Sequence, residues 1–349
     1  MAISSSMPCW IGPPGNCGRS NMDEFELIGR YFAHMGAARA DVDLGVGDDA
    51  ALLRVPESTD LVAAVDTIVE GRHFPAGAAA RSIGHRALAV NLSDIAAMGA
   101  EPAWATLALT LPRADKEWLD GFARGLGELA CAHGVALVGG DTTAGPLTIS
   151  VQILGHVPRG SAMRRGGGKA GDVLAVTGTL GDAGAGLALA TGALELKDPA
   201  AARDLLERFE YPTPRVEFGI AARGIASAAM DISDGLVGDL PKLAAAGGLG
   251  AAVDVERLPM SGALRAAGDA QQARSWALGA GDDYELLVAV PPERFGELAA
   301  RAEQLNLTLT AIGELNRGNA VKWTLHGAEF TPAVHGFDHF RRASTQITV

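Results

Sequence analysis

Acidic residues beside apolar segments recur along this chain and are its first candidates for chemistry. Six stretches share the pattern: GVGDDAALL (45–53), AAVDTIVEG (63–71), NLSDIAAMG (91–99), VGGDTTAG (138–145), MDISDGLVGDL (230–240) and GAGDDYELL (279–287). We predict an acidic turn at each of these places. Clustered Asp residues without His or Cys partners offer hard oxygen ligands, which Mg²⁺ prefers. The candidate metal ligands are Asp49, Asp66, Asp94, Asp141, Asp231 and Asp234.

Convergence of these six carboxylates would require cations. Two unit charges about 4 Å apart repel by about 1 kcal/mol in water and by about 4 kcal/mol at an effective dielectric near 20. A nucleotide triphosphate would add more negative charge, so several divalent ions would have to bridge carboxylates and phosphates. The pattern therefore favours phosphoryl transfer, in which metal ions neutralise the transferring group.

An ordinary structural role is the alternative for each of these residues taken alone. Ser233 and Asp234 precede an apolar run, where Ser and Asp often cap the first turn of a helix. Gly139 and Gly140 would let a backbone approach phosphate oxygens, but they equally suit a buried strand with a tight turn. Arg165 could fork onto a phosphate or belong to a solvated surface. A capped helix and a metal site are compatible at the same turn.

The sequence does not match two familiar nucleotide-binding motifs. GGGKAG (166–171) resembles a Walker A loop, but Met163 stands where the first Gly should be, and Ala170 replaces the Ser or Thr that holds Mg²⁺. No GxGxxG fingerprint follows the first strand, so a dinucleotide-binding fold has little support.

Length, composition and charge bound the class of protein. A chain of 349 residues with 48% apolar residues is long enough for two domains that each bury a core. The formal net charge of -12 argues against nonspecific nucleic-acid binding. No run of 18 apolar residues is present, so we expect no membrane span.

The cysteines and the N-terminal segment indicate a compartment. Cys9, Cys17 and Cys131 have no pairing pattern and no metal-ligand spacing, which favours a reducing environment, and we predict the cytoplasm. Pro and Gly interrupt the first residues where a signal peptide needs a continuous apolar stretch. We therefore expect residues 1–21 to be a disordered extension, with Met22 as a candidate functional start.

From Met22 onward the pattern predicts alternating strands and helices, typical of mixed α/β domains. Helices are expected over 25–33, 82–100, 116–134, 199–210, 214–228 and 235–247. Strands are expected over 61–69, 104–112, 135–140, 147–157, 250–255, 284–290 and 309–315. The Gly-rich basic segment 158–172 is the best boundary candidate. We place one domain at 22–157 and a second at 158–349.

Taken together, these motifs resemble one family. GVGDDAALL, VDTIVEGRHF, ALAVNLSDIAAMGAEPAWATLALTLP, VGGDTT, DISDGL and GDDYELL resemble, in order and over about residues 22–340, the bacterial thiamine-monophosphate kinase family of the aminoimidazole ribonucleotide synthetase superfamily. This superfamily uses ATP without a P-loop, so the failed Walker match is expected.

The resemblance implies a fold and a reaction. The fold is two-domain and α/β, with an N-terminal ATP- and Mg-binding domain whose four-stranded sheet pairs with that of a second subunit, and a C-terminal α/β domain. A homodimer is expected. The implied reaction converts ATP and thiamine monophosphate to ADP and thiamine diphosphate with several Mg²⁺ ions.

The resemblance also implies roles for particular residues. The six candidate Asp residues match the family's magnesium ligands. Positions that contact ATP match Gly140, Asp141, Arg165 and Ser233. Positions that contact thiamine monophosphate match His73, Asp282 and Phe337.

Three positions depart from the family pattern. Asp282 stands where Glu is usual and is shorter by one methylene. Ala64 and Val65 replace hydroxyl residues, so any metal contact there must come from backbone carbonyls. Phe337, where Trp or Tyr is frequent, keeps a stacking surface without a polar tip.

We expect direct in-line transfer with no catalytic residue beyond the metal ligands. The acceptor phosphate is largely ionised at neutral pH because its second pKa is near 6, so no general base is needed. One rival is another superfamily enzyme, such as aminoimidazole ribonucleotide synthetase or selenophosphate synthetase. A nonenzymatic protein that binds ATP or divalent cations is the rival of a different class.

Overall fold

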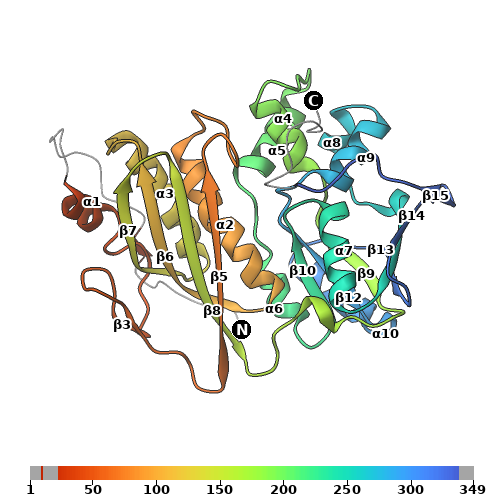
Figure 1. Ribbon diagram of the computed structural model, residues 1–349, viewed down its shortest axis with the longest axis horizontal. Helices are drawn as coiled ribbons and strands as arrows, with labels where there is room; N and C mark the ends of the chain where they lie inside the picture. Colours follow the sequence, from red (N-terminus) through yellow and green to blue (C-terminus); the bar gives the residue numbers. More distant parts are fainter. Residues whose placement is uncertain (1–8, 11–22, 338–349) are drawn as a thin grey trace. The chain divides into compact units, whose positions relative to one another are not determined.

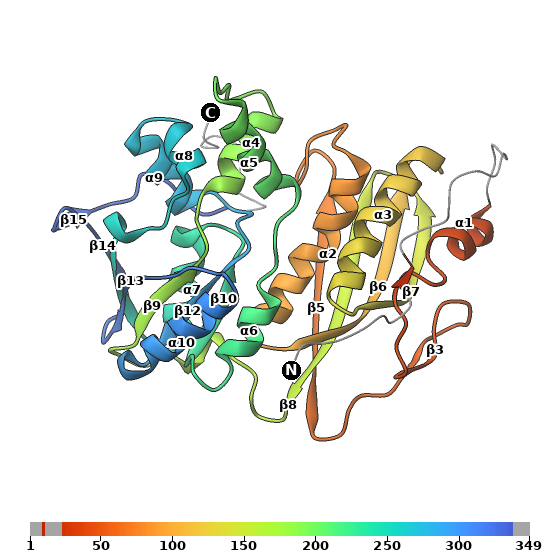
Figure 2. The same ribbon diagram turned by 180° about the vertical axis from the view of Figure 1, so that it is seen from behind.

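The computed structural model describes residues 9–10 and 23–337 of the chain, which form two compact units (Figures 1 and 2). Unit 1 runs to Ile95 and resumes from Ala100 to Gly160, and unit 2 holds Ala96–Gly99 and the chain from Ser161 onward. The assignment of one domain to 22–157 and a second to 158–349 stays a prediction.

Unit 1 is built on a six-stranded sheet. The strand order is β1 (Cys9–Trp10), β2 (Gly36–Ala37), β7 (Ala136–Ala144), β6 (Glu101–Leu111), β8 (Thr148–Pro158) and β5 (Thr59–Val69). The four long strands are those that the resemblance implied, and β1 and β2 extend the sheet beyond β7. Helices α2 (Ala80–Ala97) and α3 (Lys116–Ala132) lie against one face of this sheet, as the two opposite views show.

Helix α3 illustrates why the sequence folds this way. Asp115 caps its start by accepting a hydrogen bond from a backbone N–H of the first turn (3.1 Å), and Gly134, with φ +65°, follows its end. The helical spacing buries one face: Leu119, Phe122 and Leu126. The Tyr31 hydroxyl of α1 (Glu24–Tyr31) donates to Asp120 of α3 (2.8 Å) and joins the two helices.

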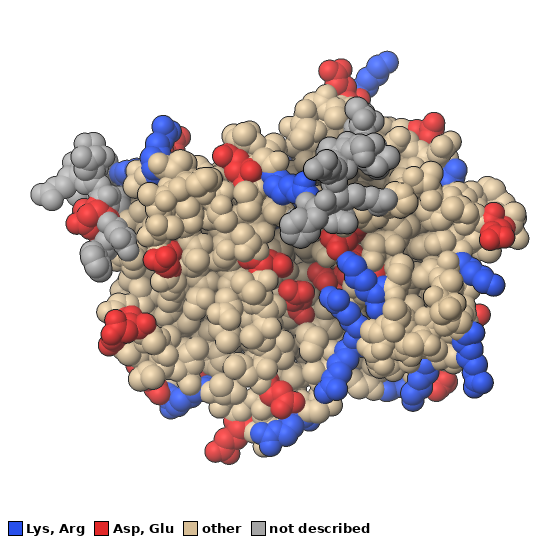
Figure 3. Space-filling view, viewed as in Figure 1, with Lys and Arg blue, Asp and Glu red and all other residues tan. Residues whose placement is uncertain are grey.

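The other face of the unit 1 sheet carries few charged side chains. The hairpin of β3 (Val42–Leu44) and β4 (Leu52–Leu53) packs Val42 and Leu53 against Trp104. On β5, Leu61 and Val65 are 49% and 62% exposed. Figure 3 views this face and shows mainly uncharged atoms over the strands.

Unit 2 is built on a seven-stranded mixed sheet. The order is β10 (Ala228–Ile232), β12 (Glu285–Val290), β9 (Val173–Thr177), β13 (Leu309–Asn316), β11 (Gly250–Asp254), β14 (Val321–Leu325) and β15 (Ala328–Phe330). Helix α7 (Leu236–Ala246) lies on one face, and α6 (Val216–Ala222) and α10 (Pro292–Gln304) lie on the other. A separate helical cluster holds α4 (Asp182–Ala190), α5 (Pro199–Glu210), α8 (Gly262–Ala266) and α9 (Ala270–Gly279). Two short 3₁₀ turns are η1 (Arg165–Gly167) and η2 (Val255–Arg257).

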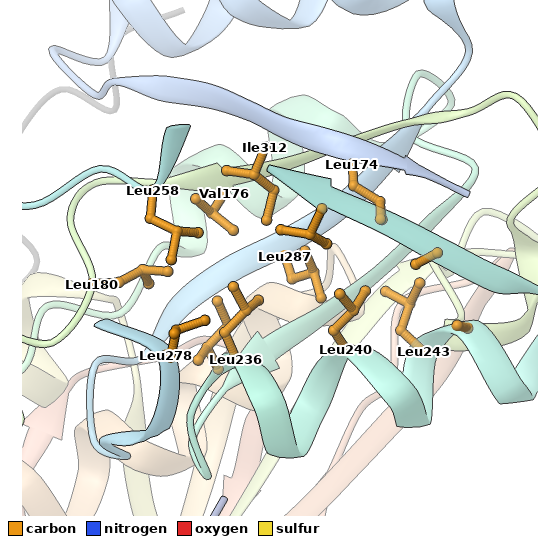
Figure 4. Close-up of a cluster of buried hydrophobic side chains, with 14 of the residues drawn as sticks. Leu174, Val176, Leu180, Leu236, Leu240, Leu243, Leu258, Leu278, Leu287 and Ile312 are labelled. Carbon is orange, nitrogen blue, oxygen red and sulfur yellow. The ribbon is translucent and has the colours of Figure 1, made fainter. Parts of the chain in front are cut away.

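The core of unit 2 fixes the start of α7. Leu236, Leu240 and Leu243 follow a helical spacing and point from α7 toward the sheet, where Val176 and Leu287 belong to the same cluster (Figure 4). A fully buried Leu contributes roughly 1.5–3 kcal/mol relative to an exposed one. This packing holds the turn between β10 and α7 in place.

One predicted helix is too long. We predicted a helix over 214–228, but α6 ends at Ala222, and Gly224 has a φ of +70°. The chain then turns and forms β10 from Ala228, a strand that we did not predict. The run of small residues AAM carries neither a clear helical nor a clear strand period, so neighbouring β12 decides its conformation.

The cysteine prediction is wrong for two of the three residues. Cys9 and Cys131 form a disulfide across 122 residues of sequence. Cys9 lies in β1, which pairs with β2, and this pairing brings it beside α3, where Cys131 lies. Sequence spacing cannot reveal such a long-range contact. Residues 9 and 10 also depart from the expected disordered extension, and Cys17 with the rest of that extension lies outside the described residues.

None of the helices in the described ranges has the length and apolar character that crossing a membrane would require.

Candidate phosphoryl-transfer site

In unit 1, Asp66 and Asp94 lie on the helix-covered side of the sheet. The backbone N–H of Asp66 in β5 donates to Asn91 Oδ1 of α2 (2.9 Å). The buried Asn91 side chain is fixed in turn, because its amide donates to Ala87 O (2.9 Å). Asp94 follows Asn91 by three residues and therefore lies on the same side of α2. The structure brings Asp66 and Asp94 to one side of unit 1, both half-buried.

Asp141 lies three strands away from Asp66. Across β5, β8, β6 and β7 the register aligns Asp66, Val151, Leu107 and Gly140. Neighbouring strands are about 4.8 Å apart, so Gly140 is roughly 14 Å from Asp66. Asp141 is the next residue in β7 and is exposed. Two carboxylates this far apart cannot share one cation within a single chain.

Gly140 occupies a position where only glycine fits. Its φ is +153°, and a Cβ there would lie 1.9 Å from Leu107 O in β6. At neighbouring Gly139 the nearest atom to a Cβ would be Thr106 Cγ2, at 3.9 Å. The β7 backbone thus approaches β6 closely at residue 140 and not at 139.

Asp49 and His73 lie in connecting segments of unit 1. Asp49 is exposed between β3 and β4, and its N–H donates to the Asp48 carboxylate (2.8 Å). His73 follows β5, and its Nδ1 accepts a hydrogen bond from Val69 N–H (2.9 Å). Because that backbone group can only donate, the neutral His73 ring carries its proton on Nε2.

Ala64 and Val65, which replace hydroxyl residues, have side chains that point in opposite directions from β5. Ala64 and Asp66 lie on one side of β5, since side chains alternate along a strand. Val65 lies on the other side and is 62% exposed. The Val65 side chain therefore faces away from a cation bound at Asp66.

In unit 2, Asp231, Ser233 and Asp234 lie where β10 meets α7. Asp231 is in β10 and is only 6% exposed. The backbone N–H groups of Ser233 and Asp234 donate to Asp239 Oδ2 (3.0 and 2.9 Å), and Gly235, at the N-cap, makes no side-chain cap bond. The ordinary capping role considered for Ser233 and Asp234 is thus not found, because the carboxylate of Asp239 reaches back instead.

Lys242 already balances negative charge at this turn. Its Nζ lies 2.6 Å from Asp234 Oδ2 and 2.9 Å from Asp239 Oδ1. Burial raises the pKa of Asp239, although the bond from Lys242 opposes this. Burial would lower the pKa of Lys242, but its bonds to Asp234 and Asp239 outweigh that effect and raise it. The Asp234 carboxylate therefore lies where a cation is favoured.

The loop before β12 is bonded to the same turn. Asp282 N–H donates to Ser233 O, and Tyr284 N–H donates to Ile232 O, both at 2.9 Å. A Cβ at Gly281 would lie 2.4 Å from Ser233 O, so the two segments are in contact.

The last described residues also reach this turn. Phe337 N–H donates to Asp234 O (3.0 Å), and the Phe337 side chain is 38% exposed. A Cβ at Gly336 would lie 2.6 Å from Gly238 Cα. The structure thus gathers five predicted site residues in unit 2: Asp231, Ser233, Asp234, Asp282 and Phe337.

Arg165 lies elsewhere in unit 2. It begins η1 and is exposed. The following glycines approach Ser227 O and Ala246 O, which belong to the opposite ends of β10 and α7 from the Asp231–Asp234 turn. The structure does not bring Arg165 to Ser233, and its contact with ATP stays a prediction.

Sequence reasoning missed three buried carboxylates that hold the unit 2 segments: Asp239, Asp283 and Glu285. Burial raises the pKa of Asp283 well above its ordinary value. A signal was present in the run DDYE, where acidic residues at alternate positions lead into a strand.

Three of the six acidic turns are wrong as turns, since Asp66 and Asp141 lie within strands and Asp94 lies within α2. In the stretch 230–240 Asp231 lies in β10, and the chain turns after Ile232. In β7 the strand continues through Ala144 because the ladder with β6 continues past the two glycines. Asp49, Asp234 and Asp282 lie in irregular chain.

The donors fit Mg²⁺ by their chemistry, since all are carboxylate oxygens and Asp234 already attracts an ammonium group. Among residues 9–10 and 23–337, no three side chains of Asp, Glu, His or Cys are grouped so that they could hold a metal ion. A site built from three such side chains of one chain is therefore not present in these ranges.

Known proteins match most of the chain. The family model for the AIR synthase related protein, N-terminal domain, matches residues 47–157, and the model for its C-terminal domain matches residues 169–326. The thiamine-monophosphate kinase of Salmonella typhimurium is 45% identical over 318 residues, 91% of this chain and 98% of that protein. The chain belongs to the thiamine-monophosphate kinase family. It is thus a member of an enzyme family of phosphotransferases.

Solved structures of the thiamine-monophosphate kinase family share this fold. The enzyme from Stenotrophomonas maltophilia K279a superimposes with a TM-score of 0.78 at 46% identity, over 83% of this chain and 92% of that one. The structure named "AaThiL complexed with AMPPCP and TMP" superimposes with a TM-score of 0.73 at 32% identity, over 84% of this chain and 92% of that one. The two-domain fold implied by the resemblance is confirmed.

Proposed function

We propose that this protein phosphorylates thiamine monophosphate to thiamine diphosphate with ATP. The observation that carries the proposal is the hydrogen bond from Asp282 N–H to Ser233 O (2.9 Å). It joins a residue proposed to contact thiamine monophosphate to a residue proposed to contact ATP. Direct transfer needs donor and acceptor side by side. The ligands named for the related AaThiL structure, AMPPCP and TMP, are an ATP-like molecule and the proposed acceptor.

The transfer is in line and direct. A terminal phosphate oxygen of thiamine monophosphate forms a bond to the γ-phosphorus of ATP, and the bond between that phosphorus and the β-phosphate oxygen breaks. ADP leaves with the electron pair. The acceptor oxygen is already ionised at neutral pH because the second pKa of a phosphate monoester is near 6. No side chain has to remove a proton.

Several Mg²⁺ ions would be held by Asp49, Asp66, Asp94, Asp141, Asp231 and Asp234. When bound, Mg²⁺ supplies positive charge that neutralises the phosphates and aligns them. The chain's own contribution is to hold these carboxylates on fixed elements. Lys242 pairs with Asp234 in this structure.

Nucleotide and acceptor would contact separate sets of residues. ATP would contact Gly140, Asp141, Arg165 and Ser233. Thiamine monophosphate would contact His73, Asp282 and Phe337. The fixed Nε2 proton of His73 suits an anionic oxygen of the acceptor, and the exposed Phe337 ring suits stacking on an aromatic ring of thiamine.

The active form would be a homodimer. In one chain Gly140 lies roughly 14 Å from Asp66, so a cation cluster that uses both Asp66 and Asp141 needs Asp141 from a second copy. The open, mainly uncharged face of the unit 1 sheet offers a surface for that copy.

The cytoplasm remains our proposed compartment because ATP is the donor. The cysteines no longer support it, since Cys9 and Cys131 form a disulfide. We propose neither nucleic acid nor a membrane as a partner, in line with the net charge of -12.

The test is product formation by the purified full chain with ATP and Mg²⁺. Parallel reactions contain thiamine monophosphate, thiamine or no acceptor. We expect ADP and thiamine diphosphate in equal amounts with thiamine monophosphate, and no thiamine diphosphate in the other two or with excess chelator. Thiamine is the matched control because it lacks only the accepting phosphate.

Other outcomes would favour the rivals. ADP formed equally with and without thiamine monophosphate, and no thiamine diphosphate, would favour another ATP-using member of the superfamily. ATP binding without any ADP would favour a nonenzymatic nucleotide-binding protein.

A further inference from the structure

In the segment from Asp282 to Glu285, two buried acidic residues alternate with Asp282 and Tyr284. Asp283 and Glu285 are 2% and 0% exposed, whereas Asp282 is half-buried and Tyr284 is 8% exposed. Asp282 and Tyr284 both have left-handed backbone conformations, with φ of +70° and +50°. A non-glycine residue rarely adopts this conformation unless its surroundings impose it. Two such residues in a four-residue segment indicate a tightly held loop.

Buried hydrogen bonds impose this conformation. Asp283 accepts from the backbone N–H groups of Gly181 (2.7 Å) and Ala183 (3.3 Å) at the start of α4. Its carboxylate thus accepts hydrogen bonds at the N-terminus of α4, where negative charge is favoured. Asp283 is therefore an anchor on one side of the loop.

Glu285 is the second anchor. It accepts from Arg208 Nη2 (2.8 Å), Arg215 Nε (2.7 Å) and Thr177 Oγ1 (2.6 Å). Two guanidinium groups and a hydroxyl satisfy this fully buried carboxylate. With Asp283 and Glu285 fixed, the residue between them has little freedom.

That residue is Tyr284, and its hydroxyl donates to Asp282 Oδ1 (3.1 Å). Since Tyr284 N–H is bonded to Ile232 O, the whole residue is held from the backbone to the ring tip. A phenol fixed in this way restricts the Asp282 carboxylate to one orientation. The bond acts on the one acidic residue in this loop that is not buried.

We propose that Tyr284 is a positioning residue that orients the Asp282 carboxylate toward the thiamine part of the acceptor. This inference rests on the proposed function. A carboxylate repels the phosphate of thiamine monophosphate, so Asp282 has to recognise the positively charged thiazolium ring or the amino group of the pyrimidine. A shorter acidic side chain makes orientation more important, because Asp has fewer rotatable bonds with which to reach a partner.

The test is Tyr284→Phe, which removes one oxygen. We expect the KM and the equilibrium Kd for thiamine monophosphate to rise roughly 3- to 10-fold, the size of a typical net contribution of one hydrogen bond. The kcat and the KM for ATP are expected to change less than twofold. The matched control is Tyr31→Phe, which removes a Tyr–Asp hydrogen bond in unit 1 (2.8 Å) and is expected to leave all four constants unchanged.

A double variant shows whether Tyr284 acts through Asp282. Asp282→Ala alone is expected to raise the KM for thiamine monophosphate, and adding Tyr284→Phe is expected to raise it no further. If Tyr284→Phe leaves this KM unchanged while Asp282→Ala raises it, or if the two effects multiply, the inference is overturned and the proposed function stands. If the unaltered protein makes no thiamine diphosphate, the proposed function itself fails.

Discussion

The two units use carboxylates in different ways. In unit 1 the proposed ligands Asp66, Asp94 and Asp141 lie on regular elements, half-buried or exposed. In unit 2, Ser233, Asp234 and Asp282 lie on irregular chain between β10 and α7 and before β12, while Asp231 lies at the end of β10. These segments are held by other carboxylates, Asp239, Asp283 and Glu285, which are buried and bonded to the protein.

The difference separates carboxylates that can receive a cation from those that brace the fold. A buried carboxylate is stable only when donors or a cation satisfy it, and Asp239, Asp283 and Glu285 are already bonded to donors of the protein. The proposed ligands on the strands and helix of unit 1 are half-buried or exposed, and the backbone of each element holds them in place. We therefore expect substitutions of the proposed ligands in unit 1 to have the largest effect on activity. Substitutions of the buried, hydrogen-bonded carboxylates of unit 2 should have the largest effect on stability.

Asp94→Asn should lower kcat by roughly 10²–10³-fold, because it removes charge where negatively charged substrates need bound cations. Stability should be nearly unchanged, since Asp94 is half-buried on a helix. Steady-state kinetics and thermal unfolding measure both. Asp115→Asn, at the cap of α3 in the same unit, is the control and should keep full turnover. Near-normal turnover of Asp94→Asn would contradict the ligand assignment.

Glu285→Gln should lower the free energy of unfolding by about 3 kcal/mol, since it leaves Arg208 and Arg215 without their buried counter-charge. Denaturant unfolding measures this. Glu297→Gln is the matched control, because Glu297 also pairs with two arginines but lies on the surface. We expect no measurable loss there. If both variants lost the same free energy of unfolding, the distinction between a buried stabilising carboxylate and a surface ion pair would be contradicted.

Gly140→Ala should lower the free energy of unfolding by about 2 kcal/mol, because its Cβ would overlap the Leu107 carbonyl. Gly139→Ala, one residue earlier and with 3.9 Å of clearance, should cost much less. The pair also tests β7 as a nucleotide contact, since Gly140→Ala should weaken ATP binding and Gly139→Ala should not. Similar losses from both would argue against the close approach of β7 to β6.

The contributions of Asp283 and Asp115 to the free energy of unfolding should change with pH in opposite directions. Burial raises the folded-state pKa of Asp283, so its contribution to stability is present below the ordinary Asp pKa and is lost as pH rises through the folded value. Relative to Asp283→Asn, the free energy of unfolding should fall from about pH 4 upward, by at most about 1.4 kcal/mol per pH unit.

Asp115 should behave in the opposite way. The backbone N–H of Trp118 lowers the pKa of Asp115, so its contribution is present above the ordinary Asp pKa and is lost as pH falls. Denaturant titrations at several pH values measure both variants. A rise in the relative stability of the unaltered protein over Asp283→Asn with increasing pH would contradict a raised pKa for Asp283.

The sequence predicted the regular elements of the scaffold better than the contacts between them. Strands such as 61–69 and helices such as 116–134 have clear periods, and the structure has β5 and α3 there. The disulfide of Cys9 and Cys131 and the row from Asp66 to Gly140 depend on strand pairing between distant segments, which no local period encodes. Asp239 escaped notice because its backward reach to Ser233 depends on the exact start of α7.

The most direct test of the central claim is Mn²⁺ binding in place of Mg²⁺, followed by the electron paramagnetic resonance signal of free Mn²⁺. The full chain is titrated with a nonhydrolysable ATP analogue and thiamine monophosphate present, beside Asp94→Asn and Asp115→Asn. We predict more than one bound Mn²⁺ per chain for the unaltered protein and for Asp115→Asn, and at least one fewer for Asp94→Asn. Equal Mn²⁺ binding by all three proteins would contradict the account.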